Sequence, residues 1–236
     1  MSDSLLNLKN SDTALMEKIK ENEGFVLQPY RLSYTDRQGN TIQEEFFTGG
    51  YGTRLTDDEY SFIDSRVNMG SAKGIGSEEQ IRALYDEKFM KSFIKAKEDA
   101  QVYMKSYGIE NSPKEVKDVI VEMAYNMGAG SVKNKSGLMS FKGFASAIRE
   151  GDYERAAQEL KFVDPNVPEK GETTYYNQIG PKKGQKEEDS RVGKLIEAIR
   201  NVSKLNSTSD NITIEELEGT PKTRSDLYSN RFFKRN

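Results

Sequence analysis

Apolar residues recur at helical spacing over much of the chain. Leu15, Met16 and Ile19 fall on one stripe, which predicts a short helix over residues 12–22. A much longer pattern follows the capping-box signature Ser77-Glu78-Glu79-Gln80. Its apolar positions are Ile81, Leu84, Tyr85, Phe89, Phe93, Ala96, Ala100, Tyr103 and Tyr107. This spacing predicts a single long helix.

Helical patterns also dominate the C-terminal half. Ser112-Pro113 is expected to open a helix with proline at the first helical position, and glycines from Gly128 onward are expected to end it. The apolar face of that helix comprises Val116, Val119, Ile120, Met123, Ala124 and Met127. Further helices are predicted at residues 140–150, 152–160 and 187–205. Most of this half should therefore pack as a helical lobe.

Residues 26–56 have a different pattern. The segments 41–43 and 46–48 are rich in β-branched and aromatic residues, and Gln38-Gly39-Asn40 is a turn signal. These features predict a small antiparallel β region, followed by a loop or short helix over residues 57–76. The expected fold class is therefore α+β, mainly α, with a low strand content.

Composition excludes several kinds of chemistry. The 236 residues include no His and no Cys, which rules out Ser-His or Cys-His catalysis, thiolate metal sites and disulfides. Carboxylates, Lys and Tyr remain for acid-base work, and no metal or cofactor is expected. The net charge is only −3, which gives no reason to expect a nucleic-acid partner.

The sequence contains no apolar run near the ~20 residues that a membrane span needs. Residues 1–11 also lack the basic start and apolar core of a signal peptide. We therefore expect a protein made in the cytoplasm and without a membrane span.

Glu23 is the leading candidate for catalysis. It falls in the last turn of the first predicted helix, just before Gly24, where the negative end of the helix dipole disfavours ionisation. Partial burial beside Phe25 would disfavour it further, so we expect a raised pKa for this carboxyl. A general acid working near neutral pH requires that property.

Three motifs surround this glutamate. The series E-G-F at 23–25, Y-x-D-x-x-G at 34–39 and T-x-G-Y-G at 48–52 resembles the active-site segment of the phage T4 lysozyme family, glycoside hydrolase family 24. That family uses a glutamate, an aspartate and a threonine in this order. The resemblance implies that Glu23, Asp36 and Thr48 are the catalytic residues.

The resemblance covers residues 13–204 and implies a lysozyme-like, two-lobed fold. Its N-terminal lobe would span about 13–76, and a linking helix with a helical C-terminal lobe would span about 77–204. Residues 1–12 would form an N-terminal arm, and residues 205–236 a polar C-terminal extension.

The resemblance also implies a set of substrate-binding residues. The family arginine that pairs with the catalytic glutamate aligns near Glu188, so Arg191 is the nearest substitute. The substrate-binding residues implied in this way are Tyr30, Tyr51, Asn126, Tyr176, Asn177, Gln178 and Arg191.

The implied activity is hydrolysis of the β-1,4 bond between N-acetylmuramic acid and N-acetylglucosamine in peptidoglycan. Protonated Glu23 would donate to the glycosidic oxygen, while Asp36 and Thr48 would handle a water on the opposite face, with inversion. The expected partners are glycan strands, and the protein is expected to be a monomer. It would act on the cell wall as a phage endolysin or as a virion-borne lysin, with residues 205–236 either solvated or docked to other phage structural proteins.

Two alternatives share this sequence pattern. A lytic transglycosylase would use Glu23 but no water, so Asp36 would be dispensable. A wall-binding or virion structural protein would keep the fold without turnover.

Overall fold

The computed structural model describes residues 10–35, 40–67, 75–134 and 136–210. Asp36, the Gln38-Gly39 part of the expected turn and most of the N-terminal arm lie outside these ranges. So does the C-terminal extension from residue 211 onward.

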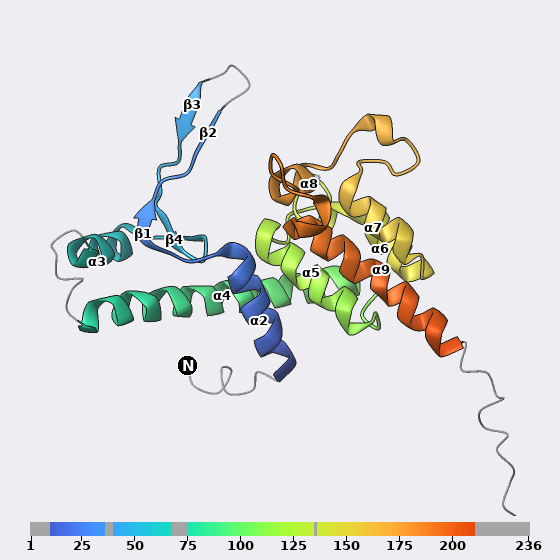
Figure 1. Cartoon of the computed structure of the whole chain (residues 1–236), viewed down its shortest axis with the longest axis horizontal. Coiled ribbons are helices and arrows are strands. Elements are labelled where there is room, and N and C mark those ends of the chain that lie inside the picture. The colour runs from blue at the N-terminus through green and yellow to red at the C-terminus, as the bar shows by residue number, and fades with distance from the viewer. Residues whose placement is uncertain (1–9, 36–39, 68–74, 135, 211–236) are drawn as a thin grey trace, which may run out of the picture.

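Helices make up most of the described chain (Figure 1), which confirms the mainly α fold class. The α-helices are α2 (Asn10–Glu23), α3 (Asp57–Val67), α4 (Ile75–Tyr107), α5 (Lys114–Met127), α6 (Lys142–Glu150), α7 (Tyr153–Lys161), α8 (Thr174–Ile179) and α9 (Arg191–Asp210). Single turns of 3-10 helix occur at η2 (Leu138–Ser140), η3 (Pro168–Lys170) and η4 (Glu187–Asp189).

The β region forms two small antiparallel sheets, as the pattern over residues 26–56 predicts. One is three-stranded in the order β1-β4-β5, and the other pairs β2 with β3. The strands are β1 (Val26–Tyr30), β2 (Ser33–Thr35), β3 (Thr41–Gln43), β4 (Thr48–Gly50) and β5 (Thr53–Arg54). Tyr30 lies opposite Thr48 in the first sheet, and β2 and β3 project away from that sheet as an arm (Figure 1).

Two predicted helix starts are wrong by a few residues. Helix α4 already begins at Ile75, so the expected capping box lies inside the helix and Glu78 instead pairs with Arg82. Helix α9 begins at Arg191 rather than at residue 187, because the Ser190 hydroxyl accepts a hydrogen bond from the Gly193 backbone at 3.1 Å and caps the helix there.

Two smaller differences concern the helix starting near Pro113 and the long connection before α9. Pro113 is the cap residue of α5 rather than its first helical residue. Residues 163–186, which read as a long connection, contain η3 and α8. The added turns shorten the irregular stretches of that connection.

The described residues pack around two hydrophobic cores. The smaller core contains Leu55, Ile63, Ile81 and Tyr85, between the first sheet, α3 and the start of α4. The larger core joins the rest of α4 to α5, α6, α7 and α9. It also takes in the buried stripe of α2, so this helix packs with the C-terminal lobe although it precedes the β region.

Helix α2 ends where the sequence predicts. The Gly24 backbone amide donates to the Lys20 carbonyl at 3.0 Å, and Gly24 then turns the chain with φ of 69°. Glu23 is therefore the last residue of α2, and β1 starts at Val26. This turn places the Glu23 carboxylate between the sheet and the helical lobe.

Candidate active site

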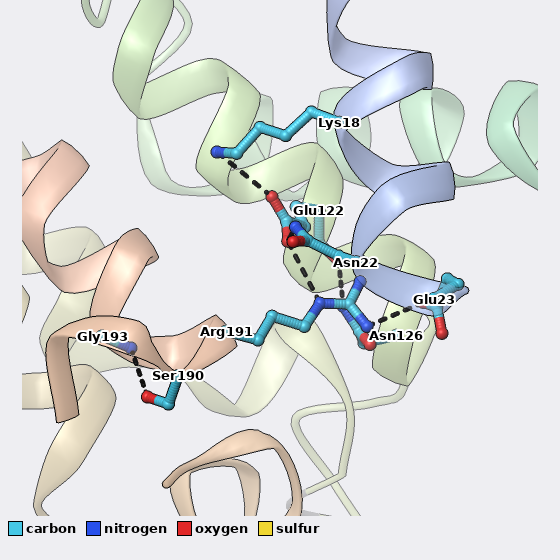
Figure 2. Close-up of polar contacts among 8 residues, drawn as sticks. All are labelled: Lys18, Asn22, Glu23, Glu122, Asn126, Ser190, Arg191 and Gly193. Carbon is cyan, nitrogen blue, oxygen red and sulfur yellow. Dashed lines mark hydrogen bonds and ion pairs between the residues drawn. The ribbon is translucent and has the colours of Figure 1, made fainter. Parts of the chain in front are cut away.

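Arg191 connects two carboxylates that come from distant parts of the chain (Figure 2). Its Nη1 donates to Glu23 Oε1 at 2.8 Å, and its Nε donates to Glu122 Oε1 at 3.1 Å. These residues belong to α2, α5 and α9. A cation at the first position of a helix is disfavoured by the helix dipole, so the two carboxylates offset that cost for Arg191.

Glu122 is the most deeply buried charged group of this cluster. Its side chain has no exposed surface, and Asn22 Nδ2 donates to its Oε1 at 2.8 Å. Lys18 Nζ lies 3.5 Å from its Oε2. A carboxylate so far from water is stable only when paired in this way. Two acids and two bases thus form a balanced cluster.

The charge state of Arg191 follows from these contacts. Burial lowers the pKa of its guanidinium, but the charges of Glu23 and Glu122 raise the pKa by more, so the net shift is upward. Arg191 is therefore a permanent cation that holds the end of α2 against the start of α9.

Two polar groups beside the cluster have no hydrogen-bond partner among the described residues. They are Arg191 Nη2 and the hydroxyl of Tyr175, both buried. Burial and the nearby charge of Glu122 raise the pKa of the Tyr175 phenol, so it stays protonated and remains a donor. Leaving a buried donor unpaired costs free energy, and a bound acceptor would remove that cost at both atoms.

Glu23 also faces the sheet. A Cβ atom on Gly52, in the turn between β4 and β5, would stand 3.5 Å from Glu23 Oε2. The Glu23 side chain keeps 19% of its surface exposed. One carboxylate oxygen therefore contacts Arg191, and the other is turned toward the β4–β5 turn.

Two cavities adjoin the cluster on the helical side. The smaller, of about 340 Å³, is lined by Asn22, Arg191 and Gln178 among others. The larger, of about 670 Å³, is lined by Asn126, Tyr175 and Gln178 among others. Because Gln178 lines both, the two cavities lie side by side next to the cluster.

The three residues expected to catalyse lie in different surroundings. Glu23 lies at the junction of the lobes, as expected. Thr48 is buried in β4, with 3% of its surface exposed. Asp36 lies outside the described residues, and the strands on either side of it, β2 and β3, project away from the first sheet (Figure 1). The catalytic roles of all three residues therefore stay predictions.

Four of the expected substrate-binding residues lie near the cluster or at the surface. Arg191 occupies the position opposite Glu23 that the resemblance assigns to an arginine. Asn126 donates to the Glu122 backbone carbonyl at 2.7 Å and lines the larger cavity. Asn177 and Gln178 are exposed on α8. Arg191 and Asn126 therefore lie in or beside the cluster, and Asn177 and Gln178 are accessible from solvent.

The three tyrosines of the set lie in different surroundings. Tyr176 is 5% exposed and packs in the larger core, with Lys161 over its ring, so its contact with substrate stays a prediction. Tyr51 packs edge-on against Phe25 and has Lys20 over its ring. Tyr30 is exposed on β1, beside Thr48.

Sequence reasoning missed Glu122 and Tyr175. A signal for Glu122 was present, because it interrupts the apolar run Val119-Ile120-Val121 and Met123-Ala124 in a helix whose other face is already polar. An acid at such a position has to be paired inside the protein. Tyr175 gave no comparable signal, since a tyrosine at an apolar position is ordinarily a core residue.

The chain matches no protein-family model, no curated protein and no solved structure. The likeness to the T4 lysozyme family thus rests on the motif residues alone. Within the described ranges, no group of acidic side chains could hold a metal ion. None of the described helices is both long and apolar enough to cross a membrane.

Proposed function

We propose that this protein is a peptidoglycan-cleaving glycosidase, a muramidase, in which Glu23 is the general acid. The observation that carries the proposal is the pairing of Glu23 with Arg191 at the junction of the β region and the helical lobe. A lone glutamate at the end of a helix would be unremarkable. One that is fixed by an arginine 168 positions later in the chain, beside two donors that lack partners among the described residues, has the features of a built site.

The geometry supports different roles for the two oxygens of the Glu23 carboxyl group. Oε1 accepts from Arg191, which fixes the orientation of the group. Oε2, on the side of Gly52, is then the oxygen that carries the transferable proton. In the proposed reaction this proton moves to the glycosidic oxygen as the bond to the sugar breaks.

A second group completes the reaction. Asp36 would take a proton from a water that attacks the opposite face of the sugar, with Thr48 orienting that water, and the product would have the inverted configuration. The two carboxyl groups would stand ~6.5–9.5 Å apart to leave room for the water. Phage lysis from the cytoplasm and action from the virion are both compatible with this chemistry.

Lysis assays on purified peptidoglycan test the proposal. Wild-type protein should reduce turbidity and release fragments that end in a reducing sugar, as shown by mass spectrometry. Glu23→Gln should lower the rate by orders of magnitude, because the amide has no proton to transfer. Glu21→Gln is the matched control, since Glu21 is exposed in the same helical turn.

Two results would change the assignment. Near-normal lysis by Glu23→Gln would remove Glu23 from the role of acid. Fragments ending in anhydro sugars would identify a lytic transglycosylase, which uses the same acid without a water.

A further inference from the structure

Glu122 on α5 is a buried acid that the proposed reaction does not use. Figure 2 shows that its carboxylate shares the guanidinium of Arg191 with Glu23. Arg191 Nε donates to Glu122 Oε1 at 3.1 Å, and Nη1 donates to Glu23 Oε1 at 2.8 Å. The side chain of Glu122 has no exposed surface, and that of Glu23 is 19% exposed. Two acids therefore share one cation at a place that is largely closed to water.

The contact with Arg191 alone would work against Glu23 as a general acid. An arginine at hydrogen-bond distance favours the ionised form of a carboxyl group and lowers its pKa, typically by ~1–3. A general acid, in contrast, has to hold its proton near the working pH. A second acid on the same arginine has the opposite effect, because its negative charge disfavours a second negative charge nearby.

The contacts on the other side of Glu122 come from the helix that carries Glu23. Asn22, the residue before Glu23, donates from Nδ2 to Glu122 Oε1 at 2.8 Å. Lys18, one turn earlier on α2, has its Nζ 3.5 Å from Glu122 Oε2 and is 40% exposed. The end of α2 therefore carries both the proposed acid and the groups that hold Glu122 in place.

Other titratable groups face Glu23 from the surrounding helices. Tyr125 on α5 and Tyr175 on α8 stay neutral, because burial raises the pKa of both phenols. Lys20 on α2 is paired with Asp86 on α4 at 2.8 Å. None of these four groups contacts Arg191 in a hydrogen bond or ion pair of the described residues.

The charged groups farther out are paired or exposed. On the side of the sheet, a cavity beside Gly52 is lined by Arg54, which is exposed, and by Lys88 and Lys91, which pair with Glu59 and Glu87. On the other side, the charged residues that line the smaller cavity with Arg191 are all exposed: Glu21, Lys182, Asp189 and Lys194. Water and salt screen exposed charges, so Arg191 and Glu122 act most directly on Glu23.

We propose that Glu122 is a positioning residue, which shares Arg191 with Glu23 and so keeps Glu23 both oriented and able to hold a proton. This inference rests on the proposed function of Glu23. Because Glu122 is fully buried, it acts on the reaction only through Arg191 and Glu23. Arg191 fixes the direction of the acid, and Glu122 offsets the charge that this contact introduces.

Two charge variants of the full chain test the inference. Glu122→Gln keeps the size of the side chain and an oxygen acceptor for Arg191 but removes the negative charge. The midpoint of the Glu23 titration, followed by carboxyl ¹³C NMR and assigned by its loss in Glu23→Gln, should fall by about one pH unit. The alkaline limb of the pH profile of lysis should move down with it. Lys18→Met should move both upward, because the charge of Glu122 then acts more strongly on Arg191 and Glu23.

Two matched controls separate this role from packing. Val116→Ala alters a buried residue of α5 six positions before Glu122. Lys97→Met removes a lysine that is 39% exposed and pairs with Asp12 on α2, so it matches Lys18 in exposure and partner helix. Loss of buried methyl groups or of an ion pair lowers stability, but neither control should move the midpoint or the alkaline limb.

A midpoint that stays or rises in Glu122→Gln would overturn the inference, and so would equal shifts in Lys18→Met and Lys97→Met. If Glu122→Gln does not fold, Lys18→Met decides alone, and the absence of an upward shift overturns the inference. Lysis by the wild type with an unmoved midpoint in Glu122→Gln would refute this inference only. The expected shifts in a protein that does not cleave peptidoglycan would refute the proposed function and leave the coupling between Glu122 and Glu23 in place.

Discussion

Arg191 Nη1 lies 2.8 Å from Glu23 Oε1, although 168 residues separate them in the sequence. The contact joins the first and last described helices, and Glu122 on α5 completes it. Only the folded chain brings these three residues together, so substitutions in the cluster should affect both the candidate site and the stability of the fold.

Removing Arg191 should destabilise the protein strongly. Arg191→Met would leave Glu122 buried with only Asn22 and the partly exposed Lys18 as partners. Breaking a buried ion pair costs about 3–5 kcal/mol. Urea denaturation should show a loss of this size, whereas Arg200→Met, which breaks an exposed pair with Glu154, should cost less than about 1 kcal/mol.

The double variant Arg191→Met/Glu122→Met should be more stable than the sum of the two single losses predicts, because it leaves no buried charge unpaired. Additive losses would show that the two residues do not depend on each other.

Tyr175→Phe should leave stability unchanged or raise it by about 1 kcal/mol, because the buried hydroxyl has no partner among the described residues. Thermal unfolding measures this directly. Tyr103→Phe is the contrasting variant, since its hydroxyl donates to the Phe141 carbonyl at 2.6 Å, and it should lose about 1 kcal/mol. If Tyr175→Phe abolishes lysis while unfolding normally, the hydroxyl serves a bound ligand.

The raised pKa of Glu159 on α7 predicts that the stability of the protein depends on pH. Its pKa is raised in the folded protein above the ordinary value of 4.5. The folded state therefore holds this proton more tightly, and the associated stability is present below pH 4.5 and lost as the pH rises through the folded-state pKa. Glu159→Gln should match the wild type at low pH and exceed it near pH 7, in unfolding experiments across this range.

The same series with Glu110→Gln, an exposed position, should show no such pH-dependent gain. A constant difference between Glu159→Gln and the wild type at every pH would mean that the carboxylate is not desolvated.

The water-handling groups can be separated by substitution. Asp36→Asn should be severely impaired in lysis, and Thr48→Ala clearly impaired, if the reaction is inverting hydrolysis. Because Thr48 is buried, Thr53→Ala is the control for a buried threonine of the same sheet.

Glu44 is the next residue to test if Asp36→Asn stays active while the products are reducing sugars. Its Oε2 is buried without a hydrogen-bond partner among the described residues, in the connection between β3 and β4. Glu44→Gln should then lower the rate of lysis.

The helices and the position of Glu23 could be predicted from the sequence, because both depend on local signals. The stripe Leu15, Met16 and Ile19 and the stop at Gly24 set the end of α2 within one residue. Helix starts depend on weaker local signals: Ser77 resembles a cap but lies inside α4, whereas Ser190 caps α9.

The partners of Glu23 could not be fixed in the same way. Arg191 was a candidate only through the family likeness, and the pairing depends on how α9 meets α2 in three dimensions. Glu122 could be read from its apolar neighbours as an acid needing a partner, but nothing local says which one. Long-range pairings of this kind follow from the packing of whole helices.

Helix α4 has 33 residues, a length of about 50 Å, and contributes side chains to both cores. Tyr85 packs in the smaller core and Phe89, one turn later, in the larger one. Neither core can melt without removing the support of this shared rod, so the chain should unfold in a single cooperative step.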